Sequence, residues 1–194
     1  MRLLVACEYS GVVRDAFIAR GHDAMSCDLL PTDVVGPHYQ GDVRDVLGDG
    51  WDMMIAHPPC TYLASSGLHW NKRIPGREAL TEEALEFVRL LLDAPIPRIA
   101  LENPVGRIST AIRKPDQIVQ PWWFGDDASK RTCLWLKNLP ALKETSRLPG
   151  DDKTRRANQT PSGQNKLGPS EDRWKLRSVT YPGIAAAMAE QWGG

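Results

Sequence analysis

Short apolar runs that alternate with helical patterns are the feature that most constrains the fold of this chain. Each run has the length of a buried strand. The runs cover residues 2–6, 24–27, 51–56, 98–101 and 132–136, and a further strand is expected to end near 41–43. Strands that alternate with helices form parallel sheets, because each helix carries the chain back across the sheet. We therefore predict an α/β fold with a mainly parallel sheet and helices on both faces.

Three segments have the spacing of helices with one apolar side. The first places Val13, Phe17 and Ile18 on one face, and the last follows Pro182 and runs to about Trp192. The clearest helix covers residues 78–93, and its expected apolar side consists of Leu80, Ala84, Phe87, Val88 and Leu91.

Length and charge limit the classes of protein to which this chain can belong. A chain of 194 residues suits a single domain over positions 1–194. Lys plus Arg and Asp plus Glu number 24 each, so bulk charge gives no argument for nucleic-acid binding. Residues 137–177 differ, with ten Lys or Arg against five Asp or Glu, a net charge of +5, and no periodicity. We predict a long basic loop there, which either is simply solvated or contacts phosphates.

The cysteines and the apolar runs indicate the compartment. The four cysteines, at positions 7, 27, 60 and 133, form no Cys-x-x-Cys pair, so they predict neither a zinc site nor a redox pair. No apolar run reaches the 18 residues that a membrane-spanning helix needs. We therefore expect a cytoplasmic protein with free thiols, without a metal and without a membrane partner.

Polar and reactive residues collect where the predicted strands end. In parallel sheets, ligands bind beyond the carboxyl ends of the strands, so these residues are expected to share one edge. They are Glu8-Tyr9-Ser10-Gly11, Asp28, Asp42, Pro58-Pro59-Cys60 and Glu102-Asn103-Pro104.

Cys60 and Glu102 are the residues best suited to covalent chemistry. Two prolines precede Cys60 and stiffen its turn, and a thiolate held in this way can attack an electrophile. The alternative is a thiol that only packs. Glu102 follows the apolar residues 99–101 and needs a partner if it is buried. It is either part of an ion pair or cap, or a group that hydrogen-bonds the edge of a base.

Asp28, Asp42 and Gly11 are candidates for binding a nucleoside. Acidic residues at such strand ends can accept hydrogen bonds from ribose hydroxyls and an adenine amino group, although Asp is also common in turns. Gly11 opens the first helix, where a glycine lets a ligand approach the backbone.

The order of these segments resembles one known family. Tyr9-Ser10-Gly11, Asp28, Gly41-Asp42, Pro58-Pro59-Cys60, Glu102-Asn103-Pro104 and Lys130-Arg131-Thr132 follow each other as in cytosine-C5 DNA methyltransferases. The Pro-Pro-Cys and Glu-Asn-Pro segments are the specific part of the match. The chain is most similar to the short members from phages and prophages, which lack a large target-recognition domain.

The resemblance implies a Rossmann-like fold, S-adenosylmethionine as the cofactor and DNA as the acceptor of the methyl group. Cys60 would add to C6 of cytosine, Glu102 would hold N3 and the 4-amino group, and Arg131 would position the base. The loop from Cys60 to about Gly76 would close over the substrate. The cofactor site would consist of Ser10, Gly11, Asp28, Asp42 and Pro58.

Three departures from the family pattern keep other functions open. Val13 and Arg14 stand where the family usually has glycines, Ser129 replaces an arginine, and only the 137–177 loop occupies the place of the target-recognition domain. The acceptor could therefore be single-stranded DNA or a free cytosine nucleotide. A third possibility is a degenerate protein that binds DNA or another partner without catalysis.

Overall fold

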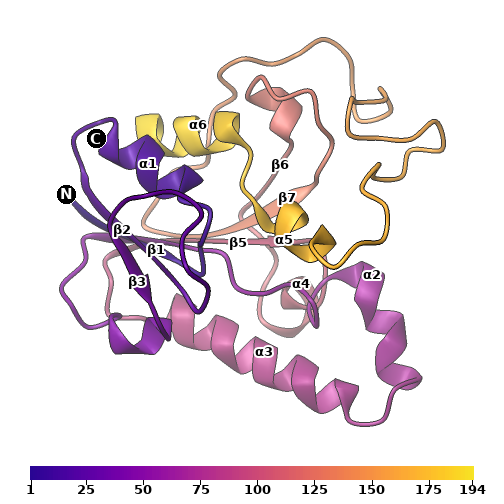
Figure 1. Cartoon of the computed structure of the whole chain (residues 1–194), viewed down its shortest axis with the longest axis horizontal. Coiled ribbons are helices and arrows are strands. Elements are labelled where there is room, and N and C mark those ends of the chain that lie inside the picture. Colours follow the sequence, from indigo (N-terminus) through magenta and orange to yellow (C-terminus); the bar gives the residue numbers. More distant parts are fainter.

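A seven-stranded mixed sheet lies at the centre of the structure, a computed structural model that describes residues 1–194 (Figure 1). Its strands are β1 (Arg2–Ala6), β2 (Asp23–Asp28), β3 (His38–Gln40), β4 (Met53–Ala56), β5 (Arg98–Pro104), β6 (Gln117–Val119) and β7 (Thr132–Lys137). Their order across the sheet is β3-β2-β1-β4-β5-β7-β6. The predicted α/β class is confirmed, and the apolar runs of the sequence coincide with the strands.

The direction of the strands divides the sheet into two parts. β3, β2, β1, β4 and β5 are parallel, whereas β7 runs antiparallel to both β5 and β6. The chain builds β1, β2 and β3 toward one edge and then returns to place β4 on the other side of β1. The carboxyl ends of β1 and β4 therefore flank the switch point of the sheet, where α/β proteins bind ligands.

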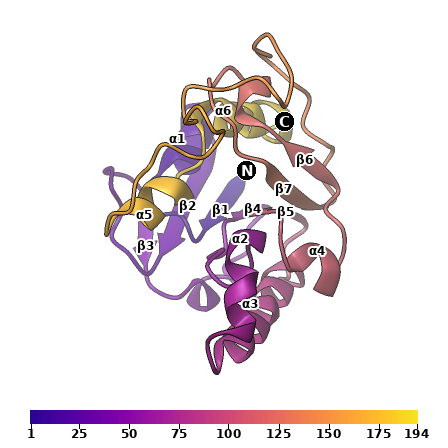
Figure 2. The same cartoon turned by 90° about the vertical axis from the view of Figure 1, so that its right-hand side faces the viewer.

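Helices cover both faces of the sheet, as Figures 1 and 2 show. α1 (Val12–Ile18) and α6 (Pro182–Trp192) pack together on one face, and α3 (Arg77–Leu92) with α4 (Ile108–Ala111) covers the other. The remaining helices are short: α2 (Ser65–Leu68), α5 (Arg173–Ser178) and the 3-10 turns η1 (Val43–Asp45), η2 (His69–Lys72) and η3 (Pro121–Trp123). No helix combines the length and apolar content that crossing a membrane requires.

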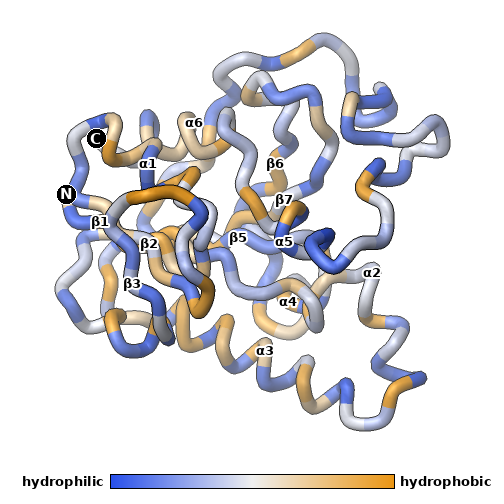
Figure 3. Tube along the Cα trace, viewed as in Figure 1, coloured by the Kyte–Doolittle hydropathy of each residue, from blue (hydrophilic) through white to orange (hydrophobic).

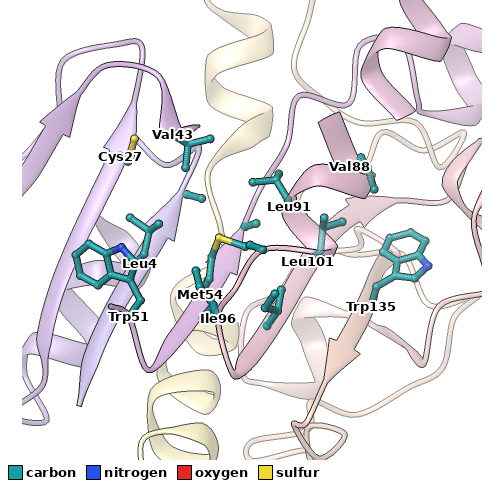
Figure 4. Packing of buried hydrophobic residues seen from close by; sticks show 14 of the residues in the cluster. Leu4, Cys27, Val43, Trp51, Met54, Val88, Leu91, Ile96, Leu101 and Trp135 are labelled. Atoms are coloured by element: carbon teal, nitrogen blue, oxygen red, sulfur yellow. The ribbon is translucent and has the colours of Figure 1, made fainter. Parts of the chain in front are cut away.

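Two apolar cores fill the space between the sheet and its helices, because successive strand side chains point to opposite faces. Leu4 of β1 faces the α3 side together with Met54, Leu101 and Trp135 (Figure 4). Leu3 and Val5 face α1 and α6, with the following partners on that side: Val13, Phe17, Ile184, Met188 and Trp192.

α3 and α1 differ from the apolar faces predicted for them. In α3 the buried residues are Thr81, Leu85, Val88 and Leu91, while Leu80 is 38% exposed. Thr81 is buried because its hydroxyl donates to the Tyr62 carbonyl and accepts from Asn71, which fastens the segment after Cys60 to the helix. Ile18, at the end of α1, is also exposed.

The predicted basic loop is mostly irregular but firmly attached. Figure 3 shows few hydrophobic positions along this segment, whose last residues form α5. Leu142 is buried in the core on the α6 side, and Arg156 is buried with its guanidinium 4.5 Å from the centre of the Trp122 ring. The aromatic run at 122–124 therefore packs against the basic segment and the core.

Arg14, at a position where the resembling family has a glycine, is fully buried in α1. Its guanidinium donates to Asp15, to the hydroxyls of Ser26 and Thr32, and to the Val34 carbonyl. A single side chain thus joins α1, β2 and the connection from β2 to β3.

Replacing Arg14 with Met is expected to lower the free energy of unfolding by about 2–4 kcal/mol, because it removes a buried hydrogen-bond network. Urea denaturation followed by circular dichroism measures this loss. The matched control is Arg20→Met, since Arg20 pairs with Glu190 on the exposed surface and should contribute less than about 1 kcal/mol. Equal urea midpoints for the two variants would contradict a structural role for Arg14.

Candidate active site

The parallel strands bring the predicted site residues to one edge of the sheet. Ala6 is paired with Cys27 of β2 on one side and with Ala56 of β4 on the other, and Ala56 is paired with Leu101 of β5. The residues that follow these positions therefore emerge side by side. The segments at 8–11, 28, 58–60 and 102–104 share this edge.

Two contacts join the turn that carries Cys60 to the strand that carries Glu102. The Asn103 side chain donates a 2.7 Å hydrogen bond to the Pro58 carbonyl. Further along, the Arg107 amide donates to the Leu63 carbonyl at 2.7 Å, and a Cβ atom on Gly106 would lie 1.9 Å from that same oxygen. Glycine at this position allows the two loops to approach so closely.

Glu102 is a buried carboxylate whose surroundings keep it ionised. The residue is 8% exposed, and its Oε2 accepts a 3.0 Å hydrogen bond from His57 Nδ1. Burial alone would raise its pKa, but Lys130, His57 and the Thr132 hydroxyl outweigh that effect and lower the pKa to about 2. Glu102 is therefore negatively charged at neutral pH.

The Cys60 thiol responds to the same charges. Cys60 is exposed as a residue, although its sulfur is partly buried. This burial and the negative charge of Glu102 raise the pKa of the thiol above the ordinary value of 9.0. Lys130 and Arg177 oppose this shift. The negative charge of Glu102 therefore favours the protonated thiol of Cys60, while the two cations favour the thiolate.

Lys130, rather than Arg131, supplies the positive charge beside this pair. Lys130 and Glu102 line one small pocket, which also includes Thr132, Thr180, Tyr181 and Ile184. Arg131 is exposed, makes no ion pair or hydrogen bond, and instead lowers the pKa of Cys133, which burial raises overall to about 11. The structure therefore does not bring Arg131 to the other predicted catalytic residues.

The turn between β1 and α1 is organised by Glu8, a residue to which the sequence assigned no role. Its carboxylate accepts hydrogen bonds from the amides of Val13 and Arg14 at the start of α1 and from the Ser10 hydroxyl. Ser10 is consequently buried and turned inward. Gly11 has a φ of 74°, a left-handed conformation that favours glycine.

Asp28 and Asp42 have different surroundings. Asp28 is half-buried at the end of β2, where burial raises its pKa and its Oδ1 accepts from the Leu30 amide. Asp42 caps η1 through the Arg44 amide and also pairs with the Arg44 guanidinium at 3.2 Å. The charge of both aspartates helps to raise the pKa of the Cys7 thiol between them. Asp42 has the contacts of a turn residue, whereas Asp28 keeps acceptor capacity for a ligand.

α5 folds over this edge from the far end of the basic segment. The Tyr9 hydroxyl donates to the Lys175 carbonyl at 2.5 Å and contacts the Ser178 hydroxyl, and the Lys175 ammonium lies 2.7 Å from an oxygen of Asp33. Arg177, two residues on, is the α5 cation that influences Cys60.

Three residues of this edge, Glu8, His57 and Lys130, carry contacts that the sequence analysis did not predict. His57 precedes the Pro-Pro-Cys turn and Lys130 precedes Arg131, so both lie beside motifs that were recognised. His57 Nε2 and Asn103 Oδ1 are buried without hydrogen-bond partners. No cluster of three His, Cys, Asp or Glu side chains could hold a metal ion.

Alkylation of Cys60 by iodoacetamide should increase with pH and reach half its maximal rate above pH 9, because only the thiolate reacts and its pKa is raised. Glu102→Gln removes a negative charge and should move the profile to lower pH. Lys130→Gln removes a positive charge and should move it to higher pH.

Mass spectrometry of the labelled peptides separates Cys60 from the other thiols, and Cys27 and Cys133 are buried enough to serve as internal controls. Identical pH profiles for the parent protein and both variants would show that the two charges do not act on Cys60.

Comparison with known proteins gives no family for this chain. No protein-family model matches it, and no curated protein matches its sequence. The residues of the site and the motifs in the sequence are therefore the basis for assigning a function.

Proposed function

We propose that this protein transfers a methyl group from S-adenosylmethionine to C5 of cytosine in DNA through a covalent adduct on Cys60. One observation carries the proposal. The Pro-Pro-Cys and Glu-Asn-Pro segments leave neighbouring strand ends and are joined by the Asn103–Pro58 hydrogen bond, and the charge of Glu102 helps to raise the pKa of Cys60.

The charges of the site suit addition of a thiol to a pyrimidine ring. Addition to C6 needs a thiolate, and N3 needs a proton as negative charge develops in the ring. Moving the Cys60 proton to Glu102 supplies both, since it creates a thiolate and a carboxylic acid that can protonate N3. Lys130 and Arg177 favour the thiolate during this step. Once C5 has taken the methyl group, water would accept the C5 proton as Cys60 leaves as a thiolate. The N3 proton would return through Glu102 to the sulfur, which restores the thiol and the carboxylate.

Among the residues on the β2 side, Asp28 is the one best suited to bind a nucleoside cofactor. A carboxylate has about four acceptor positions, so Asp28 can bind ribose hydroxyls while it keeps its bond to the Leu30 amide. Pro58 is buried beside the Cys60 turn, and Ser10 and Gly11 shape the neighbouring loop. S-adenosylmethionine, when bound there, supplies an electrophilic methyl group. The order of the strands is compatible with a Rossmann-like fold of this class.

A binding protein without catalysis is the second candidate. It is favoured by the closed position of α5 over Tyr9 and by a resting thiol whose pKa is raised. Such a protein would bind DNA but show no heat of binding with S-adenosylmethionine.

The protein should form a covalent complex with DNA containing 5-fluorocytosine when S-adenosylmethionine is present, because fluorine blocks the final elimination. Denaturing gel electrophoresis measures the complex. Cys60→Ser should abolish it, and Glu102→Gln should slow its formation at least a hundredfold.

Cys133→Ser is the matched control for trapping, since Cys133 is buried in the core and should be dispensable. A complex that forms unchanged in Cys60→Ser would exclude Cys60 as the nucleophile. Complex formation with free 5-fluorodeoxycytidine monophosphate, but with no form of DNA, would assign the nucleotide as the acceptor.

Asp28→Asn should weaken binding of S-adenosylmethionine at least tenfold, because a hydrogen bond to a charged group is lost. Asp42→Asn should have a smaller effect on affinity, since that side chain is occupied by Arg44. Isothermal titration calorimetry gives both affinities, and the reverse ranking would place the ribose at Asp42.

A further inference from the structure

Only two of the seven tryptophans are exposed: Trp70 in the segment after Cys60, and Trp174 on α5, which contacts Tyr9 in the turn between β1 and α1. Trp70 of η2 is 43% exposed and Trp174 of α5 is 58% exposed. Of the remaining five, four are buried and Trp123 is half-buried. An exposed tryptophan leaves a large apolar surface in water, which commonly indicates a binding surface when other apolar groups accompany it.

Six other large apolar residues are exposed in segments that follow strands or lie near the two tryptophans in the sequence. Three lie in the connection after β2, one follows η2, one follows β5 and one is on α5: Leu29, Val34, Val35, Ile74, Val105 and Leu176. Together with the two tryptophans they form what we call the edge patch. The remaining large exposed apolar residues, Ile18, Leu80 and Leu90, are on α1 and α3.

Each exposed tryptophan is embedded in a basic sequence. Trp70 is followed by Asn71-Lys72-Arg73, and Trp174 lies within the run Arg173 to Arg177. The Arg73 guanidinium lies 5.5 Å from the centre of the Trp70 ring. Arg177 influences the Cys60 thiol, so the positive charge of α5 extends to the candidate nucleophile.

Both segments are held in place by contacts of residues next to the tryptophans, and both tryptophans stay exposed. In η2, Asn71 donates to Thr81 of α3 at 2.8 Å. In α5, Tyr9 and Asp33 hold the Lys175 backbone and ammonium, while Trp174 and Leu176 on either side of Lys175 remain exposed. Figure 1 shows α5 on the face toward the viewer and α2, which η2 follows, to its right.

On the basis of the function proposed above, we propose that the acceptor is single-stranded DNA and that Trp70 and Trp174 stack its bases on the two sides of the target cytosine. Exposed aromatic rings with interleaved cations suit unpaired bases, whose flat faces are available for stacking. In duplex DNA those faces are already stacked on each other. The patch is basic as well as aromatic. A phosphate backbone therefore complements its charge better than the surface of a typical protein partner would.

Fluorescence anisotropy with a short labelled oligothymidylate tests the stacking separately from methylation, because thymine cannot accept the C5 methyl group. The parent protein should bind this single strand more tightly than a duplex of equal length, and affinity should fall as salt is raised. Trp70→Ala and Trp174→Ala should each weaken binding about tenfold or more.

Three control variants distinguish loss of stacking from loss of folding. Trp70→Phe and Trp174→Phe should restore much of the affinity, because phenylalanine still stacks. Leu90→Ala, on the exposed face of α3, should bind like the parent protein.

Duplex DNA bound as tightly as the single strand, or unchanged affinity in both alanine variants, would overturn this inference, as would the absence of binding to any oligonucleotide. The trapping experiment with 5-fluorocytosine tests the methyl transfer on its own, so the two proposals can fail independently.

Discussion

The hydrogen bond from Asn103 to the Pro58 carbonyl is the contact on which the candidate site depends. Parallel pairing of β4 and β5 brings the ends of the two strands together but does not determine how the following loops approach each other. Asn103 joins them, and Gly106 lets the backbone beyond them come into contact. The prolines before Cys60 then limit the directions that the thiol can take.

A buried negative charge is costly, and the site is arranged around that cost. Glu102 remains ionised because His57, Lys130 and Thr132 stabilise the carboxylate more than burial destabilises it. These groups come from two separate parts of the chain, the turn before Cys60 and the segment 130–132. Because the same carboxylate raises the pKa of Cys60, the protonation of the two residues is coupled, and a ligand that binds one of them changes the other.

The strand pattern and the shared edge could be predicted from the sequence, since buried strands require apolar runs and parallel strands end together. The reversed direction of β7 could not, because a strand buried on both faces has the same composition in either direction. β6 was missed because it is only three residues long. The motif resemblance points to Arg131, but neighbouring residues of an extended chain face opposite sides, and it is Lys130 that lines the same pocket as Glu102.

Glu8 has a consequence for the kind of cofactor that this fold can accept. In dinucleotide-binding proteins of similar topology, the pyrophosphate lies against free amides at the start of the first helix. Here the carboxylate of Glu8 already occupies those amides. A phosphate group at this position would have to displace the Glu8 carboxylate from the amides, and its charge would then be repelled by that nearby carboxylate. At the first turn of α1, the amides that could hold a phosphate are thus satisfied from within the chain.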